Sequence, residues 1–198
     1  QVAATTDSPP SKPVRSIAVI SAEADAVWKT SRGKRIGRGT ALEPGTLTLL
    51  EGLAQVDFFS GASITLSGPA EIELRNKKLA VLHRGRVRAD VPPAARGFKI
   101  ETADVQLEDL GTSFGIVARD NGKSSVIVFD GEVCAIDRGG EELSLLEGDT
   151  AHLARGNASK SSSDNLGTFP DISAIIERSN GLGKSRYAQW KSVATKRR

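Results

Sequence analysis

Apolar and polar residues alternate along most of the segment from residue 14 to residue 154. A period of two is typical of strands that bury one face, because successive side chains point to opposite sides. Helical periodicity is nearly missing here, so the pattern predicts an all-β domain. The residues predicted to point into the core are Ile64, Leu66, Ile72, Leu74, Val87, Ala89 and Val91. Those predicted to face water are Thr65, Glu71, Glu73, Arg86, Arg88 and Asp90.

Glycine punctuates these short strands at irregular intervals. Because glycine adopts positive φ without a Cβ penalty, we expect the chain to turn corners at these positions. The varying spacings do not fit a fixed-period repeat. Two architectures remain open, an irregular β-solenoid-like body and a flattened antiparallel β-sandwich. The glycines that start a run are Gly45, Gly52, Gly61, Gly68, Gly85, Gly97, Gly111, Gly131 and Gly148.

The two ends of the chain differ in composition from the β domain at 14–154. Residues 1–13 are rich in Ser, Pro and Thr, which predicts a disordered linker. Residues 155–169 are rich in Ser and Asn, which predicts a flexible linker. Residues 170–198 predict a short α-helical extension, with Asp171 as a helix N-cap. We expect this extension to lead into a further domain downstream.

The positive net charge of +3 comes from the C-terminal tail. Residues 184–198 hold six of the 27 basic residues and none of the 24 acidic ones, so the rest of the chain carries −3. Within the β domain, Arg84, Arg86 and Arg88 would line one outward face, but no aromatic residue accompanies them. Nucleic-acid binding favours basic stripes with interleaved aromatics, so we expect a solvated face and no nucleic-acid partner.

The residues that usually carry catalysis or bind metals are sparse. The chain has two histidines, His83 and His152, and one cysteine, Cys134, which we expect to be buried in a strand. It lacks a P-loop and a nucleophile elbow. We therefore expect no catalytic residues, no cofactor and no metal. No apolar run is long enough to span a membrane, so we expect membrane contact only through an anchor outside this sequence.

The segment Asp109-Leu110-Gly111-Thr112-Ser113-Phe114-Gly115 resembles the Asp-Thr-Gly-Thr-Ser-Phe loop of aspartic proteases. Those enzymes need two carboxylates that share a proton, and this chain carries one such motif. A structural role is the better interpretation: Gly111 takes a tight turn, Asp109 or Thr112 caps free amides, and Phe114 anchors the next strand. We expect Asp109→Asn to lower stability and Gly111→Val to cause misfolding.

The order of several short motifs resembles the FecR domain family over roughly residues 35–153. The set of motifs is Gly39-Thr40-Ala41-Leu42-Glu43-Pro44-Gly45, Leu49-Leu50-Glu51-Gly52, Phe58-Phe59-Ser60-Gly61, Leu66-Ser67-Gly68-Pro69-Ala70, Gly85-Arg86-Val87, Gly97-Phe98, Asp109–Gly115, Val128-Phe129-Asp130-Gly131 and Leu146-Glu147-Gly148-Asp149. The details are similar to a planctomycete-type subgroup, in which a laminin-G or concanavalin-like domain follows.

The resemblance implies an extracytoplasmic sensing and protein-interaction domain of an anti-sigma-factor-like transmembrane regulator. It implies a periplasmic or cell-surface location, with membrane anchoring in the full-length protein. Its expected partner is another protein, such as the signalling domain of an outer-membrane transporter. The alternative is a structural spacer that presents a downstream laminin-G-like carbohydrate-binding domain at the cell surface.

Overall fold

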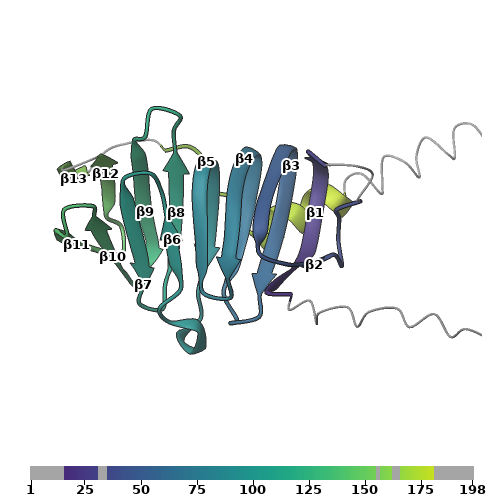
Figure 1. The fold of residues 1–198 in the computed structure, drawn as a ribbon, viewed down its shortest axis with the longest axis horizontal. Helices are drawn as coiled ribbons and strands as arrows, with labels where there is room; N and C mark the ends of the chain where they lie inside the picture. The colour runs from purple at the N-terminus through teal and green to yellow at the C-terminus, as the bar shows by residue number, and fades with distance from the viewer. Residues whose placement is uncertain (1–15, 31–34, 155–156, 162–165, 181–198) are drawn as a thin grey trace, which may run out of the picture.

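The computed structural model describes residues 16–30, 35–154, 157–161 and 166–180. Within them, 13 strands form one hydrogen-bonded sheet, and a short C-terminal helix follows (Figure 1). The prediction of an all-β fold with a short helical extension is therefore confirmed. The elements are β1 (Ala18–Trp28), β2 (Ala41–Leu42), β3 (Gly45–Phe58), β4 (Ser63–Asn76), β5 (Leu79–Asp90), the 3-10 turn η1 (Pro93–Ala95), β6 (Lys99–Glu101), β7 (Val105–Asp109), β8 (Ser113–Ala118), β9 (Ser124–Asp130), β10 (Glu132–Asp137), β11 (Glu142–Leu146), β12 (Thr150–Ala154), β13 (Asn157–Ser161) and the helix at residues 172–180.

The sheet divides at β5. One half of β5, residues 79–81, pairs in parallel with β6 and starts the branch β6–β7–β10–β11. The other half, residues 85–90, pairs antiparallel with β8 and starts the branch β8–β9–β12–β13. Both branches contribute to one core, together with β1, β3 and β4. The described chain is thus an open, largely antiparallel sheet with two branches (Figure 1), and it lacks the repeated coils of a solenoid.

The long strand β3 bends in its middle. It buries Leu47 and Leu49 before the bend and Ala54, Val56 and Phe58 after it, so the buried positions change from odd to even numbers. Its pairing with β4 shifts register between these two halves. A bulge of this kind bends a strand and redirects the side chains that follow. Both halves of β3 can therefore face the same core.

Glycines occupy the bend in three adjacent strands. A Cβ on Gly52 of β3 would lie 2.2 Å from the carbonyl oxygen of Asp25 in β1. One on Gly68 of β4 would lie 2.8 Å from the backbone of Glu51, and one on Gly85 of β5 would lie 2.6 Å from the β4 backbone. Real Cβ atoms do not approach other atoms this closely, so these positions have no room for a side chain.

The alternating pattern places the core side chains correctly. All seven residues predicted to point inward are at most 4% exposed. Among those predicted to face water, Glu71, Glu73 and Asp90 are partly exposed, but Thr65 is only 2% exposed. Thr65 lies in β4 between Gln55 of β3 and Arg88 of β5, and a short side chain between two long ones is readily covered.

The described residues after residue 154, 157–161 and 166–180, pack against the body. Within the predicted linker at 155–169, residues 157–161 form β13 and pair with β12, and Leu166 is buried. Asp171 caps the helix as predicted, because its Oδ1 accepts a hydrogen bond from the Ala174 amide at 3.2 Å. The predicted linker at 1–13 and the part of the extension after residue 180 lie outside the described residues. No helix among those described is long and apolar enough to cross a membrane.

The glycine contacts at the bend predict a sharp difference between two alanine substitutions. Gly52 and Gly39 both have a φ of 83°, but a Cβ on Gly39 would meet nothing within 4 Å. We expect Gly39→Ala to lower the free energy of unfolding by about 1 kcal/mol through backbone strain alone. Gly52→Ala adds a backbone clash and should cost about 3 kcal/mol or more. Equal losses in urea unfolding would contradict this account.

Candidate functional site

The Asp109 carboxylate caps the turn between β7 and β8. Asp109 is fully buried at the end of β7. Its Oδ2 accepts a hydrogen bond from the Gly111 amide at 2.7 Å, and its Oδ1 accepts one from the Thr112 hydroxyl. Its backbone carbonyl accepts a further bond from the Gly97 amide at 3.0 Å. The side chain therefore binds the turn that its own residue begins, in the manner of an Asx turn.

Burial sets the electrostatics of this carboxyl group. Loss of hydration raises the pKa of Asp109 from 3.8 to about 6. Hydrogen bonds from the Gly111 and Thr112 amides and the nearby charge of Arg96 oppose that rise. Near neutral pH the group is thus mostly ionised, and its charge is balanced by donors that belong to the turn.

The rest of the motif packs closely around this cap. Gly111 has a φ of 101°, and a Cβ there would lie 2.8 Å from Nε of Arg96. Thr112 is 4% exposed, and its methyl group would lie 2.6 Å from a Cβ on Gly131. Phe114 is fully buried in β8. The four motif residues therefore lie together, with Phe114 inside the core and the other three around the turn.

This geometry leaves little room for catalysis at Asp109. Both carboxylate oxygens accept bonds within the turn and the residue has no exposed surface, so a substrate cannot reach it. Among the described residues, no group of three His, Cys, Asp or Glu side chains could hold a metal ion. The arrangement has the features of a structural cap and not those of a protease dyad.

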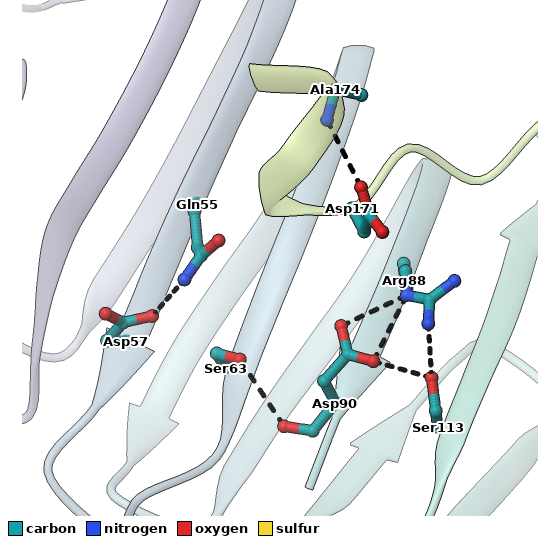
Figure 2. A network of polar contacts seen from close by, with 8 residues as sticks. All are labelled: Gln55, Asp57, Ser63, Arg88, Asp90, Ser113, Asp171 and Ala174. Carbon is teal, nitrogen blue, oxygen red and sulfur yellow. Dashed lines mark hydrogen bonds and ion pairs between the residues drawn. The ribbon is translucent and has the colours of Figure 1, made fainter. Parts of the chain in front are cut away.

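The Ser113 hydroxyl connects the motif to a polar network on the outer side of the sheet. It donates to Oδ1 of Asp90 at 2.5 Å and accepts a bond from Nη2 of Arg88 at 2.7 Å (Figure 2). Arg88 Nε also donates to both Asp90 oxygens at 3.1 Å. The Arg88 guanidinium lies 4.6 Å from the Phe129 ring centroid. Alternation predicted outward positions for Arg88 and Asp90 but not their partners, which depend on the pairing of β5 with β8.

Residues 166–171 cross the outer face of the second branch, and we call this segment the strap. Nη2 of Arg86 donates to the Leu166 carbonyl at 2.8 Å, and the Arg86 guanidinium lies 5.3 Å from the Phe169 ring centroid. The Phe169 ring contacts Phe129 edge-on at 5.7 Å. It also lies over Gly115, where a Cβ would be 2.6 Å from the ring. Gly115, the last residue of the motif, thus leaves the space that the Phe169 ring fills.

The strap leads directly into the C-terminal helix. Ile175 of this helix is buried with Ala24 of β1 and Leu53 of β3 in a small second cluster. The Ser179 hydroxyl donates to the Glu23 carbonyl at 3.1 Å. The segment 166–180 therefore runs from the second branch to β1, as Figure 1 also shows for the helix. Phe169 is the one aromatic residue in the polar stretch 155–169. A lone aromatic residue in such a stretch is the one feature of the sequence that could have predicted packing of the strap against the sheet.

The predicted arginine stripe is divided between different partners. Arg84 forms an ion pair with Glu71 at 3.6 Å, at the bend of β5. Arg86 and Arg88 lie after the bend, Arg86 beside the Phe169 ring of the strap and Arg88 beside the Phe129 ring of β9. The interpretation of these residues as a simple solvated face is wrong, because the strap covers part of it.

Cys134 is half-buried in β10 and not fully buried as predicted. Its neighbours Val133 and Ala135 point into the core, so alternation places the thiol on the opposite side of the strand. Burial raises the pKa of the thiol, and the charges of Glu142, Glu108 and Glu132 raise it further. A protonated thiol is a weak nucleophile, so we expect low reactivity.

A second surface lies at the other side of the motif. Leu110 is 40% exposed and Leu146, at the end of β11, is 54% exposed. A cavity of about 400 Å³ is lined by Arg96, Leu110, Gly111, Gly131 and Glu132. Glu132 pairs directly with Leu146 in the sheet, so the cavity and both leucines belong to one surface. We call it the Leu110–Leu146 surface.

Comparison with known protein families finds a match to part of this chain. Residues 47–134 match the FecR protein family. The match runs from β3 into β10 and contains the Asp109–Phe114 turn, so the FecR resemblance is confirmed for that segment. No curated protein matches the chain. The planctomycete-type subgroup and the downstream laminin-G-like domain stay predictions.

Two crystal structures share the fold. Both are described as "a putative anti-sigma factor" from Parabacteroides distasonis ATCC 8503. One has 19% sequence identity and a TM-score of 0.52, and the other has 18% and 0.51. Each match covers 60% of this chain and 60% of the other. At this identity the likeness shows a common fold.

The buried Asp109 predicts a pH-dependent effect of Asp109→Asn. Its folded pKa of about 6 exceeds the unfolded value of 3.8, so its contribution to stability is complete below about pH 4 and is lost as the pH rises through 6. We expect Asp109→Asn to destabilise the domain most in acid. The difference in unfolding free energy from wild type should shrink by about 2 kcal/mol between pH 4 and pH 7. Urea unfolding across this range measures it, and a constant difference would argue against the raised pKa.

The contact of Phe169 with Gly115 predicts that Gly115→Ala releases the strap. The new methyl group would occupy the ring's position, while the backbone of Gly115 is already suited to alanine. We expect faster hydrogen exchange in residues 166–180 and a loss of about 1–2 kcal/mol. With Phe169→Ala the clash disappears, so Gly115→Ala should cost much less in that background. Additive effects of the two substitutions would rule out this direct contact.

Proposed function

We propose that this chain is the extracytoplasmic sensing and protein-interaction domain of a FecR-type, anti-sigma-factor-like transmembrane regulator. The observation that carries the proposal is the FecR match over residues 47–134. The shared fold with structures described as an anti-sigma factor supports it. The domain would act in the periplasm or at the cell surface, held to the membrane by an anchor elsewhere in the full-length protein.

The Leu110–Leu146 surface is the best place for a protein partner. Exposed leucines beside a cavity are typical of interaction sites, because burying them on binding releases water from apolar surface. The signature turn of the motif supplies Leu110 to this surface, and Asp109 holds that turn in place. A role in binding would explain why a turn with a buried structural carboxylate presents a leucine to solvent.

The adjacent strand β11 offers a second means of contact. β11 is the last strand of its branch and, among the described residues, pairs on one side only, with β10. A free strand edge presents backbone donors and acceptors to which an extended segment of another protein can add. The partner implied by the FecR resemblance, a signalling domain of an outer-membrane transporter, could bind in this way.

The strap favours a second function, that of a spacer. Residues 166–180 are held against the sheet from Leu166 to Ser179, so the last described residues have a defined place beside β1. A segment held in this way could set the orientation of a domain that follows it. A downstream carbohydrate-binding domain would then be presented at a defined angle.

Charge substitutions on the Leu110–Leu146 surface test the interaction function. Leu146→Lys and Leu110→Lys should abolish photo-crosslinking of the full-length protein, carrying a crosslinker at position 144, to its partner in cells. A lysine buried in an apolar contact loses its hydration, so both substitutions should weaken binding of the partner. The response of the regulated promoter should therefore fall together with the crosslinking. Leu50→Lys is the matched control, since Leu50 is 42% exposed at the bend in β3.

The outcomes separate the two functions. Loss of both crosslinking and promoter response in the two variants, with Leu50→Lys unchanged, supports the regulator. An unchanged promoter response in Leu110→Lys and Leu146→Lys contradicts this surface as the signalling contact. Crosslinks only to later parts of the same protein favour the spacer.

A further inference from the structure

A cavity of about 290 Å³ lies at the far end of the second branch from the motif turn. It is lined by Arg119, Lys123, Ser124, His152, Leu153, Ala154 and Ser159. These residues come from the β8–β9 hairpin and from β12 and β13. The cavity shares no residue with the Leu110–Leu146 surface or with the strap. We call it the Arg119 pocket.

Two positive charges face each other across the base of this hairpin. The Arg119 amide donates to the Lys123 carbonyl at 3.0 Å, so the two residues oppose each other where β8 and β9 meet. Like charges placed directly opposite on neighbouring strands repel. Neither side chain forms an ion pair in the described part of the chain. Nearby Asp104 and Asp120 therefore do not balance them through a direct contact.

The protein holds one of these charges in a defined position. Nη1 of Arg119 donates to the Ser125 hydroxyl at 2.8 Å, and the same oxygen lies 2.9 Å from Nδ1 of His152. Ser125 is fully buried. A buried hydroxyl that contacts both side chains fixes the guanidinium and the imidazole beside each other, which lowers the entropic cost of binding a ligand between them.

We propose that the Arg119 pocket binds a small molecule through an oxyanion group, a phosphate or a carboxylate. A guanidinium presents several donors in a planar fork that matches either group, and Lys123 adds a second positive charge. The ligand would relieve the repulsion between the two cations. The cavity is larger than a bare phosphate needs, so the anion would carry a small polar body that reaches the Ser159 side of the pocket.

The two histidines of the chain provide a built-in comparison for testing the site. His152 lines the pocket, whereas His83 lies in β5 beside Glu73 at 3.6 Å. The experiment is a titration of the whole chain with sodium phosphate, and separately with sodium acetate, at constant pH and ionic strength. NMR of the histidine ring protons follows both residues in the same spectrum. We expect a saturable shift of the His152 signal and none of the His83 signal.

Variants show whether the arginine carries the binding. Arg119→Gln should raise the dissociation constant for the anion about tenfold, which is about 1.4 kcal/mol of binding free energy. Arg119 is exposed, so the variant should fold normally. Arg138 is an exposed arginine in the β10–β11 turn, so Arg138→Gln is the matched control and should bind the anion as wild type does.

The two titrations also distinguish the ligands. Tighter binding of phosphate than of acetate would indicate a phosphate ester as the ligand, and tighter binding of acetate would indicate a carboxylate. Equal, unsaturable shifts of both histidines, or an Arg119→Gln titration like that of wild type, would overturn the proposal.

Discussion

Close backbone contacts at the bend of the long strands hold the architecture together. Gly52 lies against the backbone of Asp25, Gly68 against that of Glu51, and Gly85 against β4, each at a distance that leaves no room for a Cβ. Because the strands pass so closely here, their halves can turn toward a common core. The change of buried positions in β3 from odd to even follows from the same bend. The division of β5 between two branches begins at Gly85, the last glycine of this row.

The division of β5 places the two surfaces for which binding is proposed. The first branch carries β10 and β11, and with them the exposed Leu146 and the cavity beside the motif turn. The second branch starts with β8 and offers its outer face to the strap and, farther along, to the Arg119 pocket. The Asp109–Gly115 motif joins the two branches. Asp109 ends β7 in one of them, and Gly115 accepts Phe169 in the other.

Charge is distributed unevenly between these surfaces. The outer face of the second branch carries Arg86, Arg88 and Arg119, of which only Arg88 has a carboxylate partner, Asp90, in the described part of the chain. The strap supplies a carbonyl that accepts a hydrogen bond from Nη2 of Arg86 and an aromatic ring beside its guanidinium, while Nε of Arg86 is buried without a hydrogen-bond partner among the described residues. Around Cys134 the first branch instead gathers Glu108, Glu132 and Glu142. The local charge around Cys134 is therefore negative, whereas the Arg119 pocket carries two positive side chains.

The sequence by itself determined the fold class, the inward side chains of the strands and the cap at Asp171, because these depend on local periodicity and on short-range hydrogen bonds. Alternation put Ile64, Leu66 and Val87 in the core without knowledge of their partners. Between a solenoid-like body and a flattened sandwich the sequence left the choice open, and the tertiary structure decided it as an open antiparallel sheet. The strap over Gly115 and the contacts of Ser125 with Arg119 and His152 were also decided only by the tertiary structure. Each of these depends on strand register and on contacts between residues far apart in the chain. A one-residue shift in register would exchange the faces on which these side chains lie, and no local pattern specifies that register.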